Sequence, residues 1–212
     1  MDTETALEWA VCSAAGTTGV EMFMPYFLNC RRVNSISVLY LSAFSKVQTG
    51  NDISMFILQD IFLNETIDVN KRIYGTAAIH TAVSKRVKRD VIVELLLKHT
   101  PCDVNLETSG MEINYTPLMK VLYDWSVETD HSKHKELKSV AYKLLSHPNI
   151  DVNKIVDGYT ALHWSAGYHA WFFGACNKSL NYAGFEFLLS CRKDVDVNVR
   201  DCHGDTALHI AT

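Results

Sequence analysis

Three of the nine histidines stand in similar local sequences, and histidine is the side chain best suited to proton transfer near neutral pH. They are His80, His163 and His209, which close the segments Ala77-Ala-Ile-His, Thr160-Ala-Leu-His and Thr206-Ala-Leu-His. A catalytic site needs one base, whereas a repeated structural unit needs the same hydrogen bond in every copy. The recurrence therefore predicts that these histidines are structural and hydrogen-bonded locally.

The other residues that could carry chemistry do not form a recognisable reaction centre. His131 and His134 lie three residues apart, but in a polar stretch with no cysteine nearby, which differs from the ligand spacing of zinc sites. The chain contains no Gly-x-Gly-x-x-Gly, phosphate-loop, Gly-x-Ser-x-Gly or His-Glu-x-x-His motif. We therefore expect no catalytic residues, no metal ligands and no cofactor, and we predict that the chain is not an enzyme.

Two of the histidine segments belong to a longer motif that occurs twice. The motif reads Gly-Tyr-Thr-Ala-Leu-His-Trp-Ser-Ala at 158–166 and Gly-Asp-Thr-Ala-Leu-His-Ile-Ala-Thr at 204–212. Its threonine can cap a first helical turn, its leucine can enter a core, and its small residues let a second helix approach. With four weaker copies, the motif starts near 5, 37, 77, 116, 160 and 206. The elements that position the histidines are thus expected to be repeated helices.

A second marker, Asp-Val-Asn, precedes four of these starts, at 68–70, 103–105, 151–153 and 196–198. Together the two markers resemble the ankyrin repeat, in which Thr-x-Leu-His-x-Ala opens the first helix. The resemblance covers essentially the whole chain and is strongest in the last two copies. It implies an all-α solenoid of stacked helix-turn-helix repeats with β-turn or hairpin connections. In the family, the recurring histidine ties the turn together through backbone and threonine hydrogen bonds.

Residues 1–212 are accordingly expected to form a single ankyrin repeat domain whose last repeat is incomplete. Since a repeat cannot bury its apolar face alone, we expect the chain to be a fragment or the front of a longer protein. An uncapped C-terminal end is expected to expose Phe185, Leu188 or Leu189. Self-association through the apolar surface of that end is therefore expected.

The composition indicates a soluble, folded and mildly acidic protein. The net charge is −4, the pI is near 6.1 and hydrophobic residues make up 48%. A chain with a net negative charge lacks the overall basic character with which proteins bind the phosphates of nucleic acid. The acidic start Met-Asp-Thr-Glu is unlike a signal peptide, and no apolar run is long enough to cross a bilayer, so we predict a cytoplasmic protein without membrane insertion. The six scattered cysteines are expected to be reduced.

Second helices are predicted over 90–98 and 135–146, the latter before Pro148. A polar insertion at 126–133 is expected to separate the helices of the fourth repeat, and an apolar insertion occupies 171–179. The cluster Lys85-Arg-Val-Lys-Arg89 fits a solvated turn between helices. It also resembles a short nuclear-import signal, which leaves a nuclear location open.

The resemblance implies a protein–protein interaction scaffold that binds a partner protein through a concave surface of turn tips and inner helices. The expected contact residues lie where repeats of the family vary: Tyr115, Tyr123, Asp124, Asp157, Tyr159, Tyr168, His203 and Asp205. Tyrosines are enriched at interfaces, and three aspartates favour a partner with a basic or mixed basic and apolar patch. Two alternatives stay open: these tyrosines pack on neighbouring turns, or Trp171-Phe172-Phe173 carries the binding.

Two other functions stay open at this stage. The chain could be the recognition arm of a larger multidomain protein, such as a ubiquitin-ligase adaptor, a channel or an enzyme, that continues beyond residue 212. It could also inhibit a transcription factor, for which the cluster at 85–89 is the one hint of nuclear traffic.

Overall fold

The structure is a computed structural model that describes residues 68–72, 75–84, 89–98, 102–167 and 181–212. This part of the chain is helical, as predicted, and contains no β-strand. Isolated bridges join Val156 to Tyr159 and Arg200 to Thr206, within two of the turns. The helices are α5 (Ala78–Ser84), α6 (Arg89–Lys98), α7 (Pro117–Val127), α8 (His131–Leu145), α9 (Ala161–Ser165), α10 (Ala183–Cys191) and α11 (Ala207–Ala211). The motif starts near 5 and 37 lie outside the described residues.

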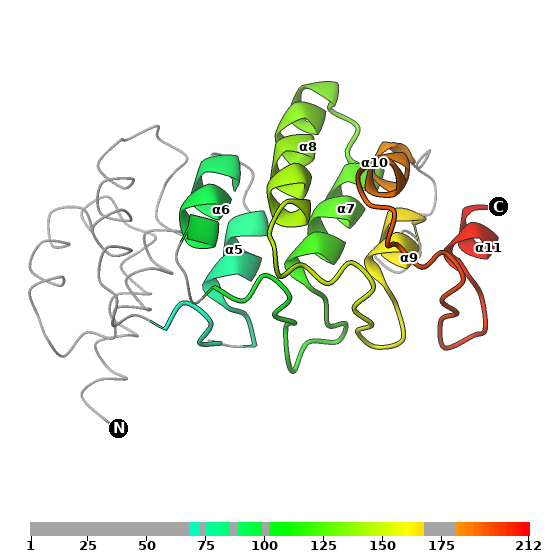
Figure 1. Cartoon of the computed structure of the whole chain (residues 1–212), viewed down its shortest axis with the longest axis horizontal. Helices are drawn as coiled ribbons and strands as arrows, with labels where there is room; N and C mark the ends of the chain where they lie inside the picture. Colours follow the sequence, from blue (N-terminus) through cyan, green and yellow to red (C-terminus); the bar gives the residue numbers. More distant parts are fainter. Residues whose placement is uncertain (1–67, 73–74, 85–88, 99–101, 168–180) are drawn as a thin grey trace, which may run out of the picture.

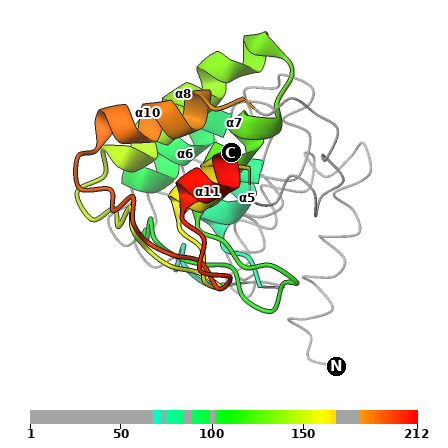
Figure 2. The ribbon, with the colours of Figure 1, turned by 90° about the vertical axis from the view of Figure 1, so that its right-hand side faces the viewer.

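The described helices lie in two layers (Figure 1). The inner row consists of α5, α7, α9 and α11, each in contact with the next. In the second layer, α6 packs on α5, and α8 packs on both α7 and α6, while α10 lies against α7 and α9 (Figure 2). The loops that lead into the inner helices project together from one side of the row (Figure 1). Each described helix therefore packs on at least one neighbour in the stack.

The inner helices begin where the repeated motif predicts. The motif residues at 77, 116, 160 and 206 each stand one position before α5, α7, α9 or α11. The Thr116 hydroxyl accepts a hydrogen bond from the Met119 N–H at 3.4 Å, and Pro117 occupies the first helical position, where a missing N–H costs nothing. At Thr160 and Thr206 the hydroxyl lies within hydrogen-bond distance of a histidine ring nitrogen, at 2.8 and 2.6 Å.

The second-layer helices differ from the prediction at their ends. α8 begins at His131 because the Asp130 carboxylate caps it, accepting the Ser132 N–H at 3.0 Å. α7 continues to Val127, so only residues 128–130 separate the two helices. The polar insertion predicted at 126–133 is therefore wrong: most of those residues are helical.

The prediction of a solvated turn is wrong for the last residue of the basic cluster. Arg89 is the first residue of α6 and is only 6% exposed. Its Nη1 lies 3.4 Å from Asp124 Oδ2 on the neighbouring α7. Its backbone N–H donates to Glu136 Oε1 at 3.0 Å. A single arginine thus joins three helices; residues 85–88 lie outside the described part.

The Asp-Val-Asn segments form a ladder of hydrogen bonds that joins successive loops. In each segment the aspartate side chain accepts the N–H of the asparagine two residues later, at 2.9 to 3.0 Å. The asparagine Oδ1 accepts the N–H of the aspartate in the next segment, at 2.7 to 2.8 Å: Asn70 from Asp103, Asn105 from Asp151, and Asn153 from Asp196. The valines of the first three segments are buried. This asparagine-aspartate ladder fixes the spacing of the stack at the base of the loops.

Candidate interaction surface

The recurring histidines hold the turns together, as predicted. His80 Nδ1 accepts the Ala77 N–H at 3.1 Å, so the ring proton lies on Nε2, which reaches the Leu106 carbonyl in the next loop at 2.8 Å. His163 makes the same two bonds: it accepts the Thr160 N–H at 3.1 Å and reaches the Asp205 carbonyl at 3.4 Å. His209 makes the first of them, accepting the Thr206 N–H at 3.3 Å. Each described turn is thus tied to its own helix, and two are tied to the following loop.

Burial keeps the imidazoles of His80 and His163 neutral. It lowers the pKa of His80 to about 4, and it also lowers the pKa of His163. Both ring nitrogens of His80 and of His163 are already occupied by hydrogen bonds. A histidine in this state has no nitrogen available to accept a proton from a substrate, which favours the structural interpretation.

Met119 occupies the histidine position of the fourth repeat and takes over half of its role. Its sulfur lies 3.4 Å from the Thr116 N–H, where the other repeats place Nδ1. Sulfur is a weak acceptor, so the turn keeps its geometry with a weaker bond. The sequence shows the departure from the motif, but nothing in it indicates that the thioether would fill the gap.

The loop tips carry the most accessible of the predicted contact residues. Asp157, His203 and Asp205 are exposed. Asp157 has a positive φ of 50° and accepts the Asn114 N–H at 2.8 Å, which links two neighbouring tips. The last tip is shaped by Asp201, whose Oδ1 accepts the N–H groups of His203 and Asp205 at 2.8 and 2.9 Å. The tips are therefore held by hydrogen bonds from within the stack.

Two of the predicted contact tyrosines are buried instead. Tyr123 is 8% exposed and Tyr159 is 5% exposed. The Tyr123 ring lies edge-on to Trp164 with centroids 6.0 Å apart, and the Tyr159 hydroxyl lies 2.9 Å from Cys202 Sγ. Their assignment as contact surface is wrong, because both rings pack on neighbouring elements.

Tyr115 and Asp124 are intermediate cases. Tyr115 is half-buried, with its ring centroid 5.8 Å from that of Trp164, and burial raises the pKa of its hydroxyl. Asp124 pairs with Arg89 and with Lys120, so its charge is largely neutralised within the stack. Tyr168 and the segment 171–173 lie outside the described residues. Among the described residues, the structure thus leaves Asp157, His203, Asp205 and the half-buried Tyr115 as the accessible part of the predicted surface.

Apolar surface is exposed around the C-terminal helix. Val197 is 48% exposed and Leu208 is 65% exposed. Phe185 and Leu189 are partly buried against the core. Leu188 is fully buried, so its expected exposure is wrong; it faces the inner row rather than the free side of α10.

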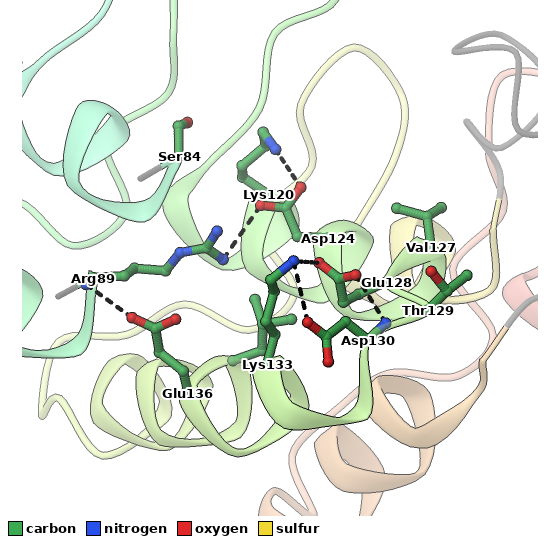
Figure 3. A pocket seen from close by; sticks show the side chains of 11 residues that line it. Ser84, Arg89, Lys120, Asp124, Val127, Glu128, Thr129, Asp130, Lys133 and Glu136 are labelled. Carbon is green, nitrogen blue, oxygen red and sulfur yellow. Dashed lines mark hydrogen bonds and ion pairs between the residues drawn. The ribbon is translucent and has the colours of Figure 1, made fainter. Parts of the chain in front are cut away.

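A charged cavity of about 520 Å³ lies where the third and fourth helix pairs meet, and the sequence did not reveal it (Figure 3). It is lined by Ser84, Arg89, Lys120, Asp124, Val127, Glu128, Thr129, Asp130, Lys133, Glu136 and Leu137. The charges at 85–89 and 126–133 are visible in the sequence as separate clusters. The stacking of α6 against α8 brings Arg89, the described residue of the first cluster, to the second.

Membrane-spanning helices, metal ligands and cysteines were searched for among the described residues. Within these ranges, no helix has the length and apolar character needed to cross a membrane. Among the same residues, no group of three or more histidine, cysteine or acidic side chains could hold a metal ion. Cys102, Cys191 and Cys202 are free thiols, and burial raises the pKa of Cys102 to about 12. The other three cysteines lie outside the described part.

Comparison with models of known protein families finds no match, and a search of curated proteins finds no significant similarity. The functional argument therefore depends on the residues and their geometry.

Proposed function

We propose that the chain is an ankyrin-type scaffold that binds a partner protein through the concave side of the stack, without catalysis of its own. The observation that carries this proposal is the asparagine-aspartate ladder. Because the same bond, made three times, joins four successive loop bases, the tips above them are presented in a row at a set spacing. A pre-organised row of this kind lowers the entropy cost of binding an extended protein surface.

The partner is expected to carry a basic or mixed basic and apolar patch. Asp157 and Asp205 are exposed at neighbouring tips, and His203 stands beside the second of them. Tyr115 adds a half-buried aromatic edge at the adjacent tip. Exposed carboxylates act mainly on the association rate and on specificity, so lysine or arginine on the partner would be guided to this row.

A non-catalytic role is supported by the state of the histidines. His80 and His163 are neutral and bonded through both ring nitrogens. In that position they stabilise the turns on which the tips stand. A cytoplasmic location, with a nuclear one as the alternative, belongs to the same proposal.

Purification of complexes with the full chain, followed by kinetic binding measurements on the recovered partner, tests this function. Asp157→Asn and Asp205→Asn remove one charge each; asparagine also tolerates the positive φ at 157. Each change should slow association by roughly two- to fivefold at low salt, the range expected for an exposed charge pair. Glu186→Gln, an exposed site on α10, is the matched control and should leave the rate unchanged. Equal association rates for all three variants would show that the loop tips are not the binding surface.

A further inference from the structure

The charged cavity is built from four helices, α5 to α8, and the short α7–α8 connection. Arg89 enters it from the start of α6, Lys120 and Asp124 from α7, and Lys133 from the first turn of α8 (Figure 3). Its volume of about 520 Å³ falls within the roughly 300–1,000 Å³ of typical ligand pockets. There is thus room for a side chain from another molecule.

Three carboxylates at the cavity each have one oxygen held by a close contact. Asp124 Oδ1 pairs with Lys120. Glu128 Oε1 accepts the Asp130 N–H at 3.0 Å, and Asp130 Oδ1 accepts the N–H and hydroxyl of Ser132 at 3.0 and 2.6 Å. These bonds lower the pKa of Glu128 and of Asp130, so both carboxylates are ionised at neutral pH. They also fix the direction of the second oxygen of each group.

The second oxygens of these carboxylates make long ion pairs. Asp124 Oδ2 lies 3.4 Å from Arg89, while Glu128 Oε2 and Asp130 Oδ2 lie 3.7 and 3.5 Å from the Lys133 ammonium. Charge-assisted hydrogen bonds between nitrogen and a carboxylate are typically about 2.7–2.9 Å long. Lys133 therefore sits between two carboxylates without a short bond to either of them.

The balance of charge at the cavity favours a cation over an anion. Among the described residues, three basic side chains and four carboxylates line it. The Arg89 guanidinium pairs with Asp124, while Glu136 accepts the Arg89 backbone N–H. At the α7–α8 connection, Lys133 lies between the two carboxylates of Glu128 and Asp130. An incoming anion would meet carboxylates on both sides, whereas an incoming cation would meet acceptors that are only loosely engaged.

We propose that this cavity is a seat for an arginine side chain of the partner protein, and that Lys133 occupies the seat until the partner's guanidinium displaces it. Arginine fits better than lysine, because a planar guanidinium can bond Glu128 and Asp130 together while one ammonium reaches neither closely. The inference rests on the proposed function in assigning the cation to a protein partner. The seat itself can be tested without that partner.

The test uses N-acetyl-arginine methylamide as a probe, titrated into the full chain and followed by amide chemical shifts in NMR spectra. Saturable shifts are expected at Asp124, Glu128 and Asp130, weakened by salt. The uncharged N-acetyl-citrulline methylamide, which has the same shape, should cause none. Glu128→Gln should weaken binding of the arginine probe by roughly two- to fivefold, and Lys133→Met should strengthen it by a similar factor.

Opposite effects of the two substitutions separate a binding seat from a merely structural cluster. Lys133→Gln is a second variant in case the methionine variant fails to fold, and melting curves check folding of each. Lys135→Gln on the exposed side of α8 is the matched control and should not change the affinity. Equal binding of the two probes, no saturable shift, or weaker binding after loss of Lys133 would overturn the proposal. None of these results would affect the tip variants, so failure here is distinguishable from failure of the proposed function.

Discussion

Removal of one asparagine from the asparagine-aspartate ladder should destabilise the stack by an amount that the structure defines. Asn105 makes two hydrogen bonds to the loop of the next repeat. Its Oδ1 accepts the Asp151 N–H at 2.8 Å, and its Nδ2 donates to the Asn149 carbonyl at 2.6 Å. A net value of about 0.5–1.5 kcal/mol for each bond predicts a loss of about 1–3 kcal/mol for Asn105→Ala.

The same motif supplies the control. Asn198 holds the equivalent position in the last Asp-Val-Asn segment, but its side chain makes no hydrogen bond to another described residue. Asn198→Ala should therefore change the free energy of unfolding by less than about 0.5 kcal/mol. Urea denaturation of the full chain, followed by circular dichroism, measures both variants, and amide hydrogen exchange locates the loss.

Exchange should accelerate in the segment around α8 and α9 for Asn105→Ala, because stability in a stacked array depends on the contacts between neighbours. Equal shifts of the urea midpoint for the two variants would refute the reasoning. So would a loss for Asn105→Ala below about 0.5 kcal/mol, since the two bonds would then be replaced fully by water.

Three further predictions follow from buried or strained positions. His80, with a pKa lowered by burial to about 4 against an unfolded value near 6.5, binds fewer protons in the folded state. Its contribution to stability is therefore complete above pH 6.5, and roughly 3 kcal/mol of stability is lost as pH falls towards 4. The His80→Gln variant lacks this titrating group, so its unfolding free energy should depend less on pH. At Gly75, where φ is 80°, an added Cβ would lie 1.9 Å from the Ser109 carbonyl oxygen. Gly75→Ala should cost more than about 2 kcal/mol in urea denaturation, whereas Gly110→Ala, at a φ of 68° with open space around it, should cost only about 1 kcal/mol. Asp157→Ala loses the bond to Asn114 and places alanine at a φ of 50°, so it should lower the melting temperature more than Asp157→Gly does, which loses only the bond.

The helical repeats were predictable because they depend on local rules. At α9 and α11 the motif Thr-Ala-Leu-His indicates where the helix starts, and the weaker copies at 77 and 116 mark the starts of α5 and α7. The roles of His80 and His163 followed from recurrence alone. The start of α8 was mispredicted because Asp130 caps the helix, which begins four residues earlier than the apolar pattern suggests, whereas its end agrees with the prediction to within one residue.

The candidate surface was less predictable because it depends on contacts between repeats. Tyr123 and Tyr159 stand at positions that vary among repeats, yet Trp164 and Cys202 on neighbouring elements cover them. The charged cavity has the same origin, since Arg89 and Lys133 belong to different repeats and meet only when the helices stack. A sequence pattern indicates which face a residue occupies but not the size of the side chain that will lie opposite.

The position of the asparagine-aspartate ladder has a consequence for how such a protein can change over evolutionary time. The ladder joins the bases of the loops, whereas the tips begin beyond it. The tips differ in length, since the segment 106–115 is longer than the segment 154–159. Insertions or deletions in a tip therefore leave the joints between repeats intact. Mutation can lengthen, shorten or recharge the tip of one repeat while the neighbouring repeats keep their registration, so the proposed interaction surface can change without a new fold.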